Sequence, residues 1–130
     1  MTYKTNAAFL VEVPVRGGTL TEGVVGNPRF INPVLAVSEA DRNLTVLVYS
    51  GLVRVTPGGE VVNDLAENIS VSEDRKIYTV RIREDAKFHD GSPVMADDVI
   101  FTVQKVGDPN IKSPRRGNWD GVEVEKLDDK

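Results

Sequence analysis

The sequence contains no cysteine among its 130 residues. This absence excludes disulfide frameworks, thiolate zinc sites and cysteine nucleophiles. No apolar run approaches the roughly 20 residues that span a bilayer. Residues Met1–Val15 also lack the basic segment and apolar stretch of a signal peptide. The sequence therefore shows no targeting signal of this kind.

The charge balance is mildly acidic. The 16 basic and 20 acidic residues leave a net charge of -4, which argues against a general nucleic-acid binder, since such proteins gather cations against phosphates. With 40% hydrophobic and 28% charged residues the composition is that of a globular protein. We expect a flexible N-terminal extension over residues 1–17 and a single domain over residues 18–130.

The first half of that domain begins with a predicted strand, Thr19–Val25, and a loop bent by two prolines, residues 26–33. Ser38 then opens a helix, because its hydroxyl can cap the first turn and Asp41 three residues later completes a capping box. The apolar residues of this helix recur at near-helical spacing, and Gly51 is placed to end it. We expect a buried stripe formed by Leu44, Leu47, Val48 and Leu52.

The second half predicts two hairpins, a helix and a last strand. Their expected ranges are Leu52–Val55 with Glu60–Val62, Ile69–Ser72 with Ile77–Arg83, the helix Ala96–Val106, and the strand Gly121–Leu127. Tyr78, Val80 and Ile82 alternate with polar residues, so we expect all three to pack against the second helix. Together these elements predict an α+β fold: a small mixed or antiparallel sheet with β-hairpins and two main helices.

One set of segments is informative beyond the periodicity of its residue types. Residues 64–66, 72–74, 78–94 and 96–99, with Phe88-His89-Asp90-Gly91-Ser92-Pro93 at their centre, closely resemble the signature of the family 5 solute-binding proteins. These are the dipeptide-, oligopeptide- and nickel-binding components of import systems. Gly18-Thr19-Leu20 with Asn32-Pro33, and the run Leu47–Leu52, extend the resemblance, although the family usually has aspartate where this sequence has Asn32.

The resemblance implies a part of the first lobe of a periplasmic-binding-protein-like fold. Members of the family close around their ligand between two lobes, so the chain is expected to be an N-terminal fragment that contributes scaffold and one side of a cleft. The implied parent is extracytoplasmic, either periplasmic or anchored at the cell surface, and binds peptides or similar solutes. It is also expected to meet the membrane subunits of an ATP-driven importer. Neither catalysis nor a cofactor is expected.

The residues suited to chemistry have structural explanations. His89 would be the first candidate for a general acid or base, yet it has no serine or cysteine nucleophile beside it and stands in a structural turn. Asp90, Asp97 and Asp98 could suggest a hard-metal site, but their spacing fits no calcium loop, and acids favour a first helical turn. For Trp119 we expect packing rather than ligand contact.

For ligand binding we single out Asn27, Pro28 and Arg29, because by resemblance the stretch after the first strand borders the cleft. Arg29 could pair with a ligand carboxylate, and a solvated loop arginine is the competing interpretation. A homodimer through the edge of Gly121–Leu127 is also expected, since that strand would lack a partner. The alternative function is a freestanding interaction domain that docks a protein through a sheet edge or the Arg115/Arg116 loop. A small hydrolase using His89 is the third hypothesis.

Overall fold

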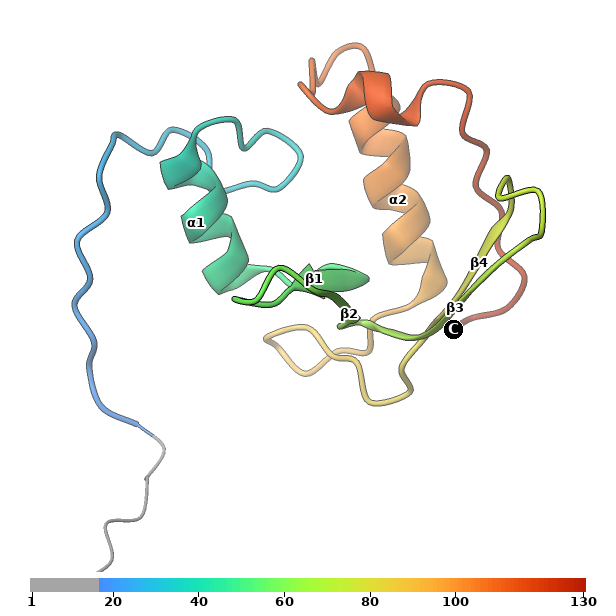
Figure 1. Ribbon diagram of the computed structural model, residues 1–130, viewed down its shortest axis with the longest axis horizontal. Coiled ribbons are helices and arrows are strands. Elements are labelled where there is room, and N and C mark those ends of the chain that lie inside the picture. The colour runs from blue at the N-terminus through green and yellow to red at the C-terminus, as the bar shows by residue number, and fades with distance from the viewer. Residues whose placement is uncertain (1–16) are drawn as a thin grey trace, which may run out of the picture.

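The computed structural model describes residues 17–130, and the sequence predictions for residues 1–16 lie outside this range. The described part holds two α-helices, two hairpins and a short 3-10 helix (Figure 1). In chain order they are α1 (Glu39–Val48), β1 (Val53–Val55), β2 (Val61–Asn63), β3 (Ala66–Val71), β4 (Tyr78–Ile82), α2 (Ala96–Gly107) and η2 (Arg116–Trp119). The α+β class is therefore confirmed.

Both predicted hairpins form, and each is an antiparallel two-stranded sheet. In the first, Arg54 lies opposite Val62, and Gly59 takes a positive φ of 85° in the connecting turn, a backbone conformation that glycine adopts without strain. In the second, Ile69 lies opposite Val80, with a bulge near Ala66. The turn residues predicted these hairpins because their conformational demands are local.

Helix α1 begins as predicted but buries a different face. The Ser38 hydroxyl accepts the Asp41 N–H at 3.1 Å, and the Asp41 carboxylate accepts the Ser38 N–H at 3.2 Å. The helix ends at Val48, before the expected Gly51. Its buried residues are Ala40, Asp41 and Thr45, whereas Leu47 is 73% exposed. The expected stripe is thus wrong for Leu47 and Val48, which are exposed, whereas Leu44 and Leu52 are half-buried. The difference arises because the helix packs its first turns against the preceding loop.

The hydrophobic core lies between the end of β4 and the start of α2. Ile82, Ala86 and Val94 are buried together, and Leu65, Ala96 and Val99 pack against them. Ile82 therefore packs against α2 as predicted, and Val80 is half-buried. Tyr78 is 62% exposed, so its predicted burial is wrong. The reason is geometric: the hairpin runs away from α2 toward its turn, so only the end of β4 meets the helix (Figure 1).

The two other predicted strands are absent from the described residues. Residues 19–25 form no ladder, and Gly121–Leu127 is not a strand either. Instead, the C-terminal segment is tied to α2 and β4: the Asp129 and Lys130 carbonyls accept the backbone N–H groups of Ala96 (3.1 Å) and Ile82 (2.7 Å). A homodimer through a Gly121–Leu127 strand edge therefore loses its structural basis.

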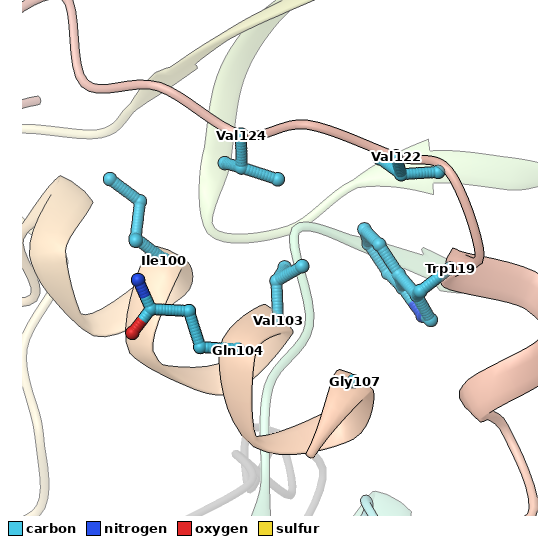
Figure 2. A pocket seen from close by; sticks show the side chains of 7 residues that line it. All are labelled: Ile100, Val103, Gln104, Gly107, Trp119, Val122 and Val124. Atoms are coloured by element: carbon cyan, nitrogen blue, oxygen red, sulfur yellow. The ribbon is translucent and has the colours of Figure 1, made fainter. Parts of the chain in front are cut away.

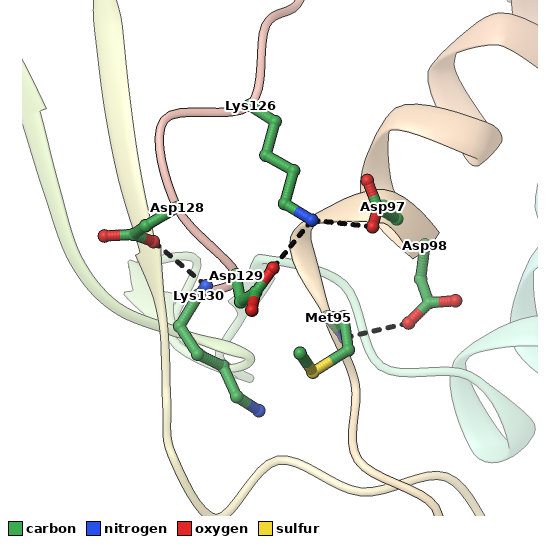
Figure 3. A network of polar contacts seen from close by, with 7 residues as sticks. All are labelled: Met95, Asp97, Asp98, Lys126, Asp128, Asp129 and Lys130. Atoms are coloured by element: carbon green, nitrogen blue, oxygen red, sulfur yellow. Dashed lines mark hydrogen bonds and ion pairs between the residues drawn. The ribbon is translucent and has the colours of Figure 1, made fainter.

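Lys126 reinforces this attachment (Figure 3). Its ammonium lies 2.7 Å from carboxylate oxygens of both Asp129 and Asp97. Hydrogen bonds to Asp129 and then Asp97 raise the pKa of Lys126 above its usual range. The Lys130 ammonium adds a bond of 2.7 Å to the Val94 carbonyl.

Candidate functional site

The predicted ligand-binding residues stand on an exposed loop that leads into α1. Asn27, Pro28 and Arg29 are all exposed. Gly26 precedes them with a φ of +120°, and a Cβ on it would lie 3.3 Å from the Ala40 Cβ. Only glycine meets both demands, so this residue lets the loop approach the helix closely.

Asp41 organises this loop. Its Oδ1 accepts the backbone N–H groups of Arg29 at 2.6 Å and Phe30 at 3.2 Å. Its Oδ2 accepts those of Val37 at 3.4 Å and Ser38 at 3.2 Å. Asp41 is 1% exposed and is the one large side chain among residues 17–130 that is buried this completely.

The electrostatics follow from this geometry. The pKa of Asp41 lies well below its usual range. The largest cause is the hydrogen bond from the Arg29 backbone N–H, and the bonds from Phe30 and Ser38 act in the same direction, whereas burial acts in the opposite one. Sequence reasoning found Asp41 as a capping residue and missed its contact with Arg29. The two residues are 12 positions apart, and no local pattern predicts such a contact.

A turn at Asn32 shapes the middle of the loop. The Asn32 Oδ1 accepts the Val34 N–H at 2.9 Å, and the Asn32 carbonyl accepts those of Leu35 and Ala36. An amide oxygen is sufficient for this turn, so the structure needs no negative charge where the family usually has aspartate. The Tyr49 hydroxyl reaches the Ile31 carbonyl at 3.4 Å, which attaches the loop to the end of α1.

The Arg115/Arg116 loop follows α2, and its basic residues Lys112, Arg115 and Arg116 are exposed. Within this loop the Ser113 hydroxyl is buried and donates to the Val34 carbonyl at 2.7 Å. The bond joins two loops that are 79 residues apart in sequence. The structure thus attaches the basic loop to the turn at Asn32, an arrangement that the sequence did not predict.

Among the remaining titratable candidates, Asp90 and Asp98 form local hydrogen bonds, and His89 is exposed. His89 is exposed in its turn, where the Ser92 hydroxyl and then the Ser92 backbone N–H lower the pKa of Asp90. Asp98 accepts the Met95 N–H at 2.8 Å at the start of α2 (Figure 3). Among residues 17–130 no group of three or more histidine or acidic side chains is placed to hold a metal ion. No helix in this part of the chain is long and apolar enough to cross a bilayer.

Two of the hollows on the surface of the described residues lie beside candidate site residues. One, of about 170 Å³, lies between α2 and the C-terminal segment, where Trp119 faces Val103 and Val122 (Figure 2). Its lining is mostly apolar, and Trp119 contributes to it while remaining 38% exposed. The other is a groove of about 520 Å³ between Glu22–Val25 and the outer face of α1, which stops two residues before Asn27.

Comparison with known proteins decides the family. A sequence profile for bacterial extracellular solute-binding proteins, family 5 Middle, matches residues 60–130. This chain belongs to that family. It is 32% identical over 117 residues to the oligopeptide-binding protein AppA of Bacillus subtilis, a match that covers 89% of this chain and 22% of AppA.

Solved structures agree with this assignment. The substrate-binding protein CtaP of Listeria monocytogenes superposes with a TM-score of 0.72 and 37% identity, covering 82% of this chain and 22% of CtaP. The binding protein AgaA from A. tumefaciens R10, in complex with agropinic acid, gives a TM-score of 0.75 at 31% identity, over 81% of this chain and 21% of AgaA. The chain therefore spans about a fifth of the length of the relatives it matches. The resemblance and the fold inferred from the signature are confirmed.

Proposed function

We propose that this chain is part of the substrate-binding component of an ATP-driven importer for peptides or similar solutes. The observation that carries the proposal is the family match together with its coverage: most of this chain aligns with about a fifth of each relative. AppA is named for oligopeptides, whereas AgaA holds agropinic acid, so the ligand class extends to small acidic solutes. The family is one of substrate-binding proteins, and we propose no catalytic role for His89.

The proposed ligand contacts are Asn27, Pro28 and Arg29. Two features support them. All three are exposed, and the Arg29 backbone is fixed by Asp41, while its guanidinium has no hydrogen bond or ion pair within residues 17–130 and could bind a carboxylate in a forked geometry. The chain supplies scaffold and one side of a cleft, with residues 18–130 acting as one domain. Its partners in the whole protein are a peptide or similar solute and the importer's membrane subunits, and its place is outside the cytoplasmic membrane.

The exposed apolar surface favours the interaction-domain alternative, since Val46 and Leu47 on α1 are 77% and 73% exposed. The family match favours the transport role, because it covers the core, β2, the second hairpin and α2.

The test of the ligand site is a titration followed by NMR. Di- to pentapeptides added at about millimolar concentration, the weak end of the affinity scale, should shift the amide signals of Asn27 and Arg29. Arg29→Gln should remove the response, whereas Arg54→Gln, a matched change at an exposed arginine in β1, should keep it. Equal responses in the two variants would refute the assignment of Arg29.

A further inference from the structure

The carboxylate of Asp41 joins the two ends of one loop. Its Oδ1 receives the backbone N–H groups at the start of the loop, Arg29 and Phe30, and its Oδ2 receives those at the end, Val37 and Ser38. One side chain from the first turn of α1 therefore closes the segment 29–38 into a ring. Four hydrogen bonds satisfy backbone donors that would otherwise lie unpaired beside the helix start.

The beginning of this loop has few other attachments. No backbone–backbone hydrogen bond joins residues 17–31 to any other residue in the range 17–130. The attachments at this end are the two bonds to Asp41, the close approach of Gly26 to Ala40, and the long bond from Tyr49 to the Ile31 carbonyl. The place of the Arg29 backbone thus depends mainly on Asp41, and the origin of the Arg29 side chain moves with it.

We propose that Asp41 is a positioning residue for ligand recognition: its carboxylate fixes the backbone from which the Arg29 guanidinium meets a ligand carboxylate. This inference rests on the proposed function of the loop. Carboxylate binding is sensitive to the position of the guanidinium, because a bidentate arginine contact requires two N–H groups to reach both oxygens. A loop that is held in place before binding also loses less conformational entropy when the ligand arrives.

The chemistry requires a carboxylate rather than an amide. An ionised aspartate presents two acceptor oxygens, whereas asparagine presents one oxygen and one NH₂ donor. Asparagine at position 41 would point its NH₂ group at backbone N–H groups at one end of the loop. It would therefore hold only one end, although it has almost the same shape. The lowered pKa of Asp41 agrees with a carboxylate that stays ionised at neutral pH.

The experiment compares three variants by NMR. Asp41→Asn removes one acceptor of the bridge. Asp98→Asn is the matched control, because Asp98 caps α2 through the Met95 N–H and lies in no such loop. Ser38→Ala removes the hydroxyl that caps α1 and leaves the four bonds to the Asp41 carboxylate in place. It therefore separates loss of the helix cap from loss of the loop bridge.

In the wild-type chain, the amide protons of Arg29 and Phe30 should be protected from solvent exchange. Added peptide should move the signals of Asn27 and Arg29. In Asp41→Asn the protection should be lost and the apparent affinity should fall about tenfold, the effect of a charge-assisted contact that is no longer aligned. Asp98→Asn and Ser38→Ala should retain both properties.

Unprotected amide protons of Arg29 and Phe30 in the wild type would overturn the proposal without any variant, so it stays testable even if Asp41→Asn fails to fold. Protected amides with an unchanged peptide response in Asp41→Asn would overturn it as well. If the wild-type loop is protected but no peptide moves its signals, the proposed ligand site is wrong. That result differs from a wild type that binds peptide through an unprotected loop, which refutes the role of Asp41 alone.

Discussion

Replacement of Ile82 by alanine tests whether the core is centred where β4 meets α2. Ile82 is 3% exposed and packs with Ala86 and Val94, with Leu65 and Val99 at the edge. The change removes three carbon atoms, worth about 0.8 kcal/mol each on transfer, so the transfer part is about 2.4 kcal/mol. The cavity left behind adds to this, since a small neighbour such as Ala86 cannot fill it, and we expect a total loss of about 3 kcal/mol.

The assay is urea unfolding, followed by far-UV circular dichroism and by the fluorescence of Trp119 beside α2. Ile77→Ala is the matched control, because it removes the same atoms at a residue that is 65% exposed, and it should cost less than about 1 kcal/mol. Since small domains have about 5–15 kcal/mol of stability, the Ile82 variant should unfold at a clearly lower urea concentration. Equal midpoints for the two variants would refute the assignment of the core.

The free energy of unfolding should also depend on pH through Asp41, because the pKa of Asp41 is lower in the folded chain than the ordinary value of about 3.9. The stability that its carboxylate contributes is therefore complete above about pH 3.9 and is lost as the pH falls below it. The difference in melting temperature between wild type and Asp41→Asn should therefore shrink on acidification, and a constant difference would contradict this linkage. Lys126→Met should speed exchange of the Ile82 amide proton, because it releases the segment whose Lys130 carbonyl accepts that proton. The pKa of Lys126 is raised, so the contribution of this clamp should be present below about pH 10.4 and be lost only as the pH rises through the raised value. Calorimetry of the isolated chain with di- to pentapeptides should show nothing tighter than about millimolar, since one side of a cleft buries little of a ligand, and a micromolar affinity would contradict the half-site interpretation.

The parts of the fold that could be predicted from the sequence are those with local causes. The turn at Gly59 and the capping box of Ser38 and Asp41 depend on neighbours within a few residues, and both are present. The strand at residues 121–127 is predicted from alternation, and the strand at residues 19–25 from alternation together with the family resemblance. Both predictions are wrong. A strand requires hydrogen bonds to a partner, and periodicity does not show whether a partner is available.

The candidate site also combines features that the sequence could predict with contacts that it could not. Asn27, Pro28 and Arg29 were chosen by resemblance, and the structure adds that their loop is exposed and closed on Asp41. The contact between Arg29 and Asp41 crosses 12 positions of irregular chain, where no repeat of residue types applies. The buried face of α1 was missed for a related reason. Ala40, Asp41 and Thr45 are its buried residues and its first turns pack on a loop rather than a sheet, so Leu47 and Val48 of the apolar stripe that normally predicts burial are exposed.

The bond from the Ser113 hydroxyl to the Val34 carbonyl has a consequence for how the chain folds. It joins positions 79 residues apart, whereas Val71 and Tyr78, which pair in the second hairpin, are only seven residues apart in sequence. Closing the longer loop costs about 2 kcal/mol more chain entropy than closing the hairpin, because each doubling of length adds about 0.6 kcal/mol. The hairpins and helices should therefore form first, and the contact between the Asn32 turn and the basic loop should form late. A substitution such as Ser113→Ala should accordingly accelerate unfolding while leaving the folding rate nearly unchanged.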